Sequence, residues 1–148
     1  MNEPATYANN LPQGRPFILA KREEIAASAS NSAIILKHNS GAPMVVERIV
    51  CLMDYKPWNT LGLCDIDLDR IEYTDEIDAT TRAMNYGTGS LALFFGPDGI
   101  LNSEKNSMAF RMRPGSELVI TVTNRDTQNA VQVEFAAHGY LEERMLTP

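Results

Sequence analysis

Glu117-Leu-Val-Ile-Thr-Val-Thr-Asn124 is the stretch that decides the fold. Its apolar side chains at positions 118, 120 and 122 alternate with a valine and two threonines, the period of two that a half-buried β-strand requires. Ser107–Arg113 before it and Val131–Ala137 after it have strand patterns as well, and short turn signals separate the three. The sequence therefore predicts a meander of three β-strands in the last third of the chain.

Further strand patterns lie upstream. Met44–Tyr55 is the longest apolar run, and its β-branched residues predict a central strand that is buried on both faces. Lys21–Ala27 could equally form one or two helical turns, and Asp69–Asp78 is too charged for a buried strand and is expected to be a loop or a short exposed helix. Shorter strands are expected at Phe17–Ala20, Glu24–Ser30, Ala33–Lys37, Leu63–Leu68 and Ser90–Phe95.

Turn chemistry separates these segments. Gly96-Pro-Asp-Gly99 and Pro114-Gly115 combine a preset proline dihedral with a glycine that accepts positive φ. About eight strands with a turn every eight to twelve residues predict an all-β fold, a single-domain antiparallel β-sandwich of jelly-roll-like type. With 148 residues, of which 44% are hydrophobic, the chain can form one stable core.

The two ends of the chain are expected to lie outside this domain. Residues 1–16 contain three prolines and three asparagines with little apolar periodicity, which predicts an extended or flexible N-terminal arm. The β-sandwich is expected over residues 17–141, and residues 142–148 form a C-terminal tail. The start of the sequence lacks a signal-peptide pattern and Met44–Met53 is interrupted by two charges, so synthesis in the cytoplasm without a membrane span is expected.

Charge is concentrated in one segment. The formal net charge is −6, and Asp65–Asp78 alone holds seven acidic residues against the single base Arg70. The remainder of the chain is neutral, and its longest basic cluster is Lys21-Arg22. This distribution disfavours nucleic acid and anionic membrane surfaces as partners.

The acidic segment raises a calcium hypothesis. Asp65, Asp67, Asp69 and Glu76 have the carboxylate spacing of positions 1, 3, 5 and 12 of an EF-hand loop. Arg70 stands where that loop requires glycine, and the flanking residues have a β pattern rather than a helical one. Alternation along a strand explains the three aspartates without a metal, so the sequence leaves calcium binding by residues 65–78 open and predicts no metal ligand.

Catalytic patterns are not evident. His38 and His138, the only histidines, lie outside any catalytic motif, and Cys51 and Cys64 are expected to be buried free thiols. Gly87-Thr-Gly89 lacks the lysine of a phosphate loop and is expected to precede a strand rather than a helix. The sequence predicts a protein that is not an enzyme, with no catalytic or cofactor-binding residues and no cofactor.

Three binding roles remain open. A carbohydrate-binding module would use exposed aromatic side chains, for which Trp58, Tyr55, Tyr73 and Tyr86 are the candidates. A host-adhesion domain would resemble it at the sequence level. The third role is a subunit of a symmetric assembly, whose terminal arms reach neighbouring copies.

A resemblance to a family favours the third role. Phe94–Ser103, Met108–Asn124 and Asn129–Tyr140 resemble a pattern of small structural proteins of tailed bacteriophages, in which a Pro/Gly-led strand and an Asn-containing turn precede a final strand that ends in a Gly-aromatic pair. The resemblance covers about a third of the chain and transfers no catalytic residues. It implies a virion component, such as a capsid decoration (cement) protein or a head-tail accessory subunit, that forms homo-oligomers and contacts other virion proteins such as the major capsid protein.

Overall fold

Nine β-strands and one short helix make up the part of the chain that the structure, a computed structural model, describes: residues 14–54, 65–74, 81–83, 87–95 and 110–142. The elements are β1 (Arg15–Ile25), β2 (Ser32–Lys37), β3 (Met44–Asp54), β4 (Ile66–Thr74), β5 (Thr81–Ala83), β6 (Gly89–Ser90), α3 (Leu91–Phe95), β7 (Phe110–Met112), β8 (Glu117–Asn124) and β9 (Val131–Leu141).

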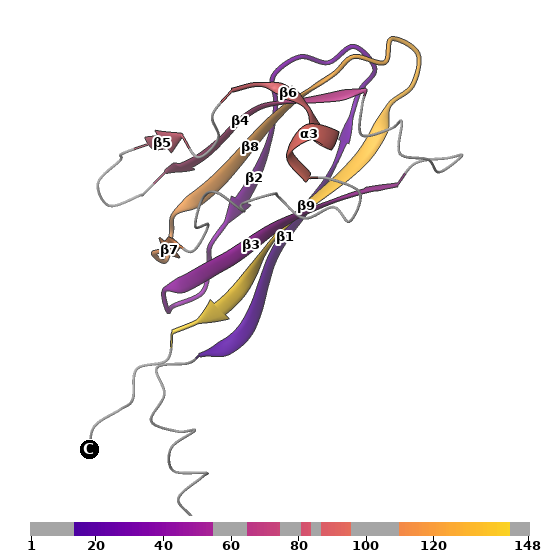
Figure 1. Ribbon diagram of the computed structural model, residues 1–148. Coiled ribbons are helices and arrows are strands. Elements are labelled where there is room, and N and C mark those ends of the chain that lie inside the picture. The colour runs from indigo at the N-terminus through magenta and orange to yellow at the C-terminus, as the bar shows by residue number, and fades with distance from the viewer. Residues whose placement is uncertain (1–13, 55–64, 75–80, 84–86, 96–109, 143–148) are drawn as a thin grey trace, which may run out of the picture.

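The strands form two antiparallel sheets that face each other (Figure 1). Sheet A has the order β1-β9-β3-β7. Sheet B has the order β2-β8-β4-β5, and the two-residue β6 pairs with β4 as well. The predicted all-β sandwich is therefore confirmed.

The pairing of the strands is nested. Leaving out the short β6, the first strand pairs with the last (β1 with β9), the second with the second last (β2 with β8), and so on through β3 with β7 and β4 with β5. Two further pairings, β3 with β9 and β4 with β8, close this folded ribbon into two sheets. Nested antiparallel pairing of eight strands in two sheets is the jelly-roll arrangement.

The predicted meander is wrong, although its strands exist. β8 spans Glu117–Asn124 as expected, and β9 continues four residues beyond Ala137 to Leu141. Successive strands do not pair, because β7 and β9 belong to sheet A while β8 lies in sheet B. Each turn crosses from one sheet to the other, and periodicity within a strand carries no signal for that choice of partner.

The core lies between the two inner faces. Alternating side chains of β8 and β9 point into it, among them Leu118, Ile120, Val133 and Phe135, and each of these four is fully buried. Burying such a side chain stabilises a fold by roughly 1.5–3 kcal/mol relative to leaving it exposed, so the period of two directly produces the stability of the sandwich.

A short helix replaces a predicted strand. Ser90–Phe95 was expected to be extended, but α3 occupies Leu91–Phe95. Leu91 and Phe95 are four residues apart, so they share one helical face, and both are fully buried. The Phe95 ring lies 5.7 Å from that of Phe135, which places the helix over the core side of β9. A short apolar run fits helix and strand equally well, which is why periodicity failed here.

β4 corrects a second expectation. The charged residues 69–74 belong to this strand rather than to a loop or a helix. The register shifts between Leu68 and Arg70, so the buried positions change phase from Ile66 and Leu68 to Ile71 and Tyr73. A β-bulge of this kind inserts one residue into the alternation, which hides the strand from a strict period of two.

β1 also differs from the prediction made from the sequence. It is one continuous strand of 11 residues, where the sequence suggested two strands or a helical turn, and its pairing with β9 starts at Arg15 opposite Leu141. The strand therefore extends two residues into the segment assigned to the N-terminal arm. The other residues of the arm before Gly14, and those of the tail after Glu142, lie outside the described residues.

Gly139 marks a point of close contact in sheet A. The register of β3 against β9 shifts between Val46 and Arg48, and a Cβ atom at Gly139 would lie 1.7 Å from the Val45 carbonyl oxygen. Only glycine allows the two backbones to approach this closely. In the described residues, no helix is long and apolar enough to cross a membrane.

Candidate interaction surface

The outer face of sheet A has an uncharged centre. The register places Ala20, Ala136 and Val50 side by side across β1, β9 and β3. Ile18 lies next to Ala20 on the same face of β1, and Leu52 lies next to Val50 on the same face of β3, at the opposite side of this row. Their exposed fractions are 58% and 57%. We call Ile18, Ala20, Val50, Leu52 and Ala136 the outer apolar band.

The band arises from the composition of β3. The sequence predicts that this strand is buried on both faces, because apolar residues occupy both alternating sets of positions. The structure corrects this prediction: Met44, Val46, Ile49 and Cys51 point into the core, while the opposite face of the strand is covered by no described element. The same pattern that suggested double burial thus identifies a face that no described strand or helix covers.

Charged residues border the band at both ends. Arg22 lies 3.5 Å from Glu134, which is its direct neighbour across β1 and β9. At the other side, His138 is half-buried between Ile18 and the exposed Arg48 in the register. The band is therefore an apolar patch within a balanced polar rim, the layout of many protein interfaces.

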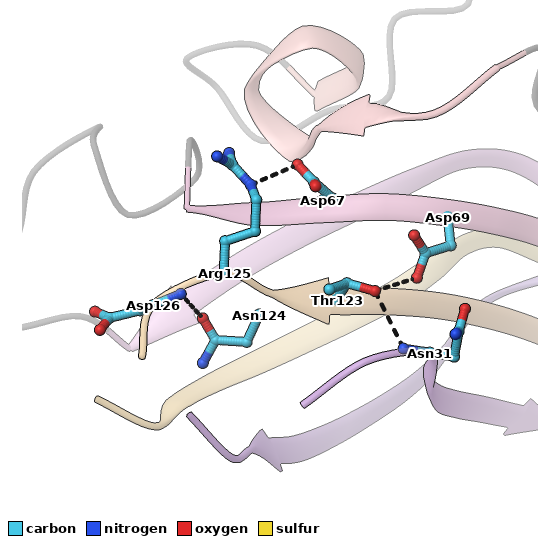
Figure 2. A network of polar contacts seen from close by, with 7 residues as sticks. All are labelled: Asn31, Asp67, Asp69, Thr123, Asn124, Arg125 and Asp126. Carbon is cyan, nitrogen blue, oxygen red and sulfur yellow. Dashed lines mark hydrogen bonds and ion pairs between the residues drawn. The ribbon is translucent and has the colours of Figure 1, made fainter. Parts of the chain in front are cut away.

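The acidic residues of β4 have a different environment (Figure 2). Asp67 accepts a 3.0 Å hydrogen bond from the guanidinium of Arg125, and Asp69 accepts one of 2.7 Å from the Thr123 hydroxyl. The Thr123 oxygen in turn accepts the backbone N–H of Asn31 at 3.1 Å. These carboxylates connect β4 to β8 and to the turn before β2.

Calcium binding by an EF-hand loop does not fit this geometry. An EF-hand needs residues 65–76 to wrap around one ion, whereas Ile66–Thr74 is an extended strand paired with β8. Arg70, which stands at the glycine position, lies 3.5 Å from Glu72. No group of three potential metal ligands occurs among the described residues, and Asp75, Glu76 and Asp78 lie outside them.

Asn124 and its neighbours form a network of hydrogen bonds at the turn after β8. The buried Asn124 amide donates to the carbonyl oxygens of Ile25, Ala26 and Asn129, and its own oxygen accepts the N–H of Asp126 at 2.9 Å. These bonds join the end of β1 to the β8–β9 turn. Asn124 is therefore a structural clamp between the two sheets.

Asp126 holds the same turn from the outside. Its carboxylate accepts the N–H groups of Gln128 and Asn129 and the Asn129 amide. These hydrogen bonds, of which the one from the Gln128 N–H has the largest effect, lower the pKa of the Asp126 carboxyl. The arrangement stabilises a turn and leaves the carboxylate no reacting partner among the described residues.

His38 has a structural environment. It is fully buried, its Nε2 lies 2.7 Å from the Ala42 carbonyl oxygen, and its ring is 6.0 Å from that of Phe17 in an edge-to-face arrangement. Its Nδ1 has no hydrogen-bond partner in the described part of the chain. The contacts tie the β2–β3 loop to β1 and give the ring a structural role.

Cys51 is confirmed as a buried free thiol. Burial raises its pKa to about 12, so the reactive thiolate is strongly disfavoured in the folded protein. Cys64 lies outside the described residues.

Of the four aromatic candidates for carbohydrate binding, only Tyr73 lies among the described residues. Tyr73 is buried, packs edge-to-face on Phe110 at 5.9 Å and accepts the Arg113 N–H at 3.4 Å, so it presents no face to a sugar. Tyr55, Trp58 and Tyr86 lie outside the described residues.

The sequence predicts a strand after Gly87-Thr-Gly89. In the structure only Gly89–Ser90 form a strand, β6, and the residues that follow are helical. The five-residue α3 begins at Leu91, two residues after Gly89. Its terminal residues Leu91 and Phe95 are both buried, so one face of the helix packs into the core. The lysine of a phosphate loop is still lacking.

Comparison with known proteins identifies no relative: no family model matches the chain, and no curated protein matches it.

Proposed function

We propose that the chain is a non-enzymatic structural subunit of a virus particle, specifically a bacteriophage capsid decoration (cement) or head-tail accessory protein that stabilises the assembly by protein–protein contacts. The outer apolar band is the observation that carries the proposal, since an uncovered apolar face on a stable sandwich favours association. Jelly rolls are common in viral capsid domains, although this support is an analogy at the level of fold.

The polar groups of the sandwich support the non-enzymatic part. Asp67, Asp69 and Asp126 hold strands and turns together, and the Nε2 atom of the buried His38 lies within hydrogen-bond distance of a backbone carbonyl. A catalytic site needs an accessible acid, base or nucleophile in a defined role. These four side chains serve the structure of the sandwich instead.

The terminal segments add a second contact for assembly. Arg15 lies opposite Leu141, so β1 begins and β9 ends at the same end of sheet A. In the proposed function, the protein is located in the virion, and its N-terminal arm contacts a neighbouring virion protein from this end.

The test uses purified particles of the virus that encodes the chain. Mass spectrometry should detect the protein in a constant ratio to the major capsid protein, and a variant lacking residues 1–13 should fold but be lost from particles. The deletion ends before Gly14 so that β1 stays intact. Absence of the full-length protein from particles, with normal amounts in infected cells, would contradict the proposal.

A carbohydrate-binding or host-adhesion module remains the alternative, because jelly rolls also include lectins. The burial of Tyr73 removes one of its four candidate aromatics. Glycan-array binding that disappears in Trp58→Ala would favour this alternative over the virion subunit.

A further inference from the structure

We propose that a second copy of this chain covers the outer apolar band, so that two sheets A pack face to face around a two-fold axis. The inference deepens the proposed function by naming one partner of the subunit, and it rests on that function for its biological role. It is tested on the purified protein alone, so its failure is distinguishable from absence of the protein from the particle.

Charge is the first argument for a second copy. By sequence, the four strands of sheet A carry five basic and five acidic residues, so the sheet is neutral. The segment Asp65–Asp78 carries all of the excess negative charge of the chain, and its described strand β4 belongs to sheet B. Two copies that meet through sheet A therefore bring together sheets that carry no net charge.

Distance reinforces this argument. Packed sheets lie about 10 Å apart, so a face-to-face dimer would have four layers with the two β4 strands about 30 Å from each other. The Debye length at physiological ionic strength is about 8 Å. Repulsion between the two acidic segments is thus screened in this arrangement, whereas contact through sheet B would place them directly against each other.

The available area is sufficient for a specific contact. β1, β9 and β3 each contain 11 residues, so the three-stranded face measures about 36 Å by 14 Å, or about 500 Å² in projection. Two such faces cover about 1,000 Å², which lies at the lower limit of specific interfaces. The expected dimer is therefore one whose population depends on concentration.

The edge of the sheet is a poorer site for a partner. β1 is the edge strand, and a second strand could pair with it, but residues 21–24 are Lys-Arg-Glu-Glu. Charged side chains on an edge strand oppose the addition of another strand. On the face of the sheet, Arg22 is paired with Glu134, and the central row Ala20, Ala136 and Val50 carries no charge.

Sedimentation equilibrium over a wide protein concentration range is the primary experiment. The wild type should shift from monomer to dimer. Leu52→Glu should weaken the dimer by at least about 100-fold, because the substitution introduces an unpaired charge twice in a symmetric interface. Ile18→Glu should act in the same direction.

Ile35→Glu is the matched control, because Ile35 has an exposed fraction of 43% on β2 of sheet B, outside the proposed interface. Its dimerisation should equal that of the wild type. Far-UV circular dichroism of each variant shows whether it has kept the fold.

Cross-linking tests the geometry while the exposed Ile18 and Leu52 stay in place. In a background with both native cysteines replaced, Ala136→Cys should give a cross-linked dimer with a short bismaleimide, and Ala33→Cys on β2 should not, although Ala33 is exposed. A wild type that stays monomeric at millimolar concentration would overturn the proposal. A dimer that survives Leu52→Glu, or one that cross-links through position 33 instead, would overturn it as well.

Discussion

The outer face of sheet A and the outer side of β4 in sheet B are both open to solvent, yet they use their side chains in opposite ways. On β4, Asp67 and Asp69 are engaged with Arg125 and Thr123, so the charged strand is fixed by its own domain. On sheet A, Ile18 and Leu52 are more than half exposed and have no covering element among the described residues. Residues that attract attention by their charge can thus be structural, while the surface available for contact is apolar.

The largest expected effect concerns the close approach of β3 and β9 in sheet A, the sheet that carries the outer apolar band. Gly139→Ala should unfold the protein or destabilise it by more than about 3 kcal/mol, because its Cβ would collide with the Val45 carbonyl. Thermal denaturation measures the change. Gly41→Ala is the matched control, since a Cβ there meets nothing within 4 Å, and its stability should be unchanged. Equal stability of the two variants would contradict the register described for β3 and β9.

The next largest effect concerns the buried hydrogen bonds of Asn124 at the end of β8. Asn124→Ala should reduce the free energy of unfolding by about 2–3 kcal/mol, because three backbone carbonyls lose their donor in a buried site. Urea denaturation measures it. Gln128→Ala serves as the control, because only the backbone N–H of Gln128 takes part in the turn. If Asn124→Ala lowered the free energy of unfolding by less than Gln128→Ala does, water would be replacing the Asn124 amide as the hydrogen-bond donor.

The buried Cys51 thiol on the core side of sheet A predicts a pH dependence of the free energy of unfolding. Its pKa rises from 9.0 to about 12 on folding, so the folded state retains a proton that the unfolded state releases. The resulting stabilisation is complete below pH 9 and declines by about 1.4 kcal/mol per pH unit as the pH rises toward 12. Cys51→Ala should therefore lose stability less steeply between pH 9 and 10.5, which chemical denaturation at each pH can measure. Identical slopes would show that the thiol is accessible.

The smallest effect concerns the exposed turn of sheet B. Folding lowers the pKa of Asp126, so its contribution is present above the ordinary carboxyl pKa and is lost as the pH falls through the lower folded value. Asp126→Asn keeps one acceptor oxygen but removes the titration. Melting temperatures between pH 2.5 and 7 should therefore decline slightly less toward acid in the variant than in the wild type. A steeper decline in the variant would contradict the role of the carboxylate in the turn.

The sequence predicted most strands from local alternation. β8 was located to the residue, β2 and β3 to within one residue, and the Pro114-Gly115 turn has the positive φ expected of its glycine. The failures at residues 69–74 and 90–95 have local causes. A bulge changes the phase of β4, and a short apolar run in α3 fits either geometry.

The candidate surface was harder to find than the strands. Val50 and Leu52 gave a signal, since β3 is apolar on both faces, but the signal was interpreted as double burial. Whether a face is covered depends on how many layers the fold has, and no residue of β3 encodes that number.

The sequence by itself determined the β-rich class, the turn positions, the acidic segment and the absence of a familiar catalytic motif, because each of these depends on residues that are neighbours in the chain. Only the tertiary structure decided that β7, β8 and β9 alternate between sheets, that the acidic side chains of β4 are held by residues of β8 and the turn after it, and that Ile18, Ala136 and Leu52 meet on one open face. These contacts join residues far apart in sequence, and their formation depends on burial of the whole core rather than on any local preference.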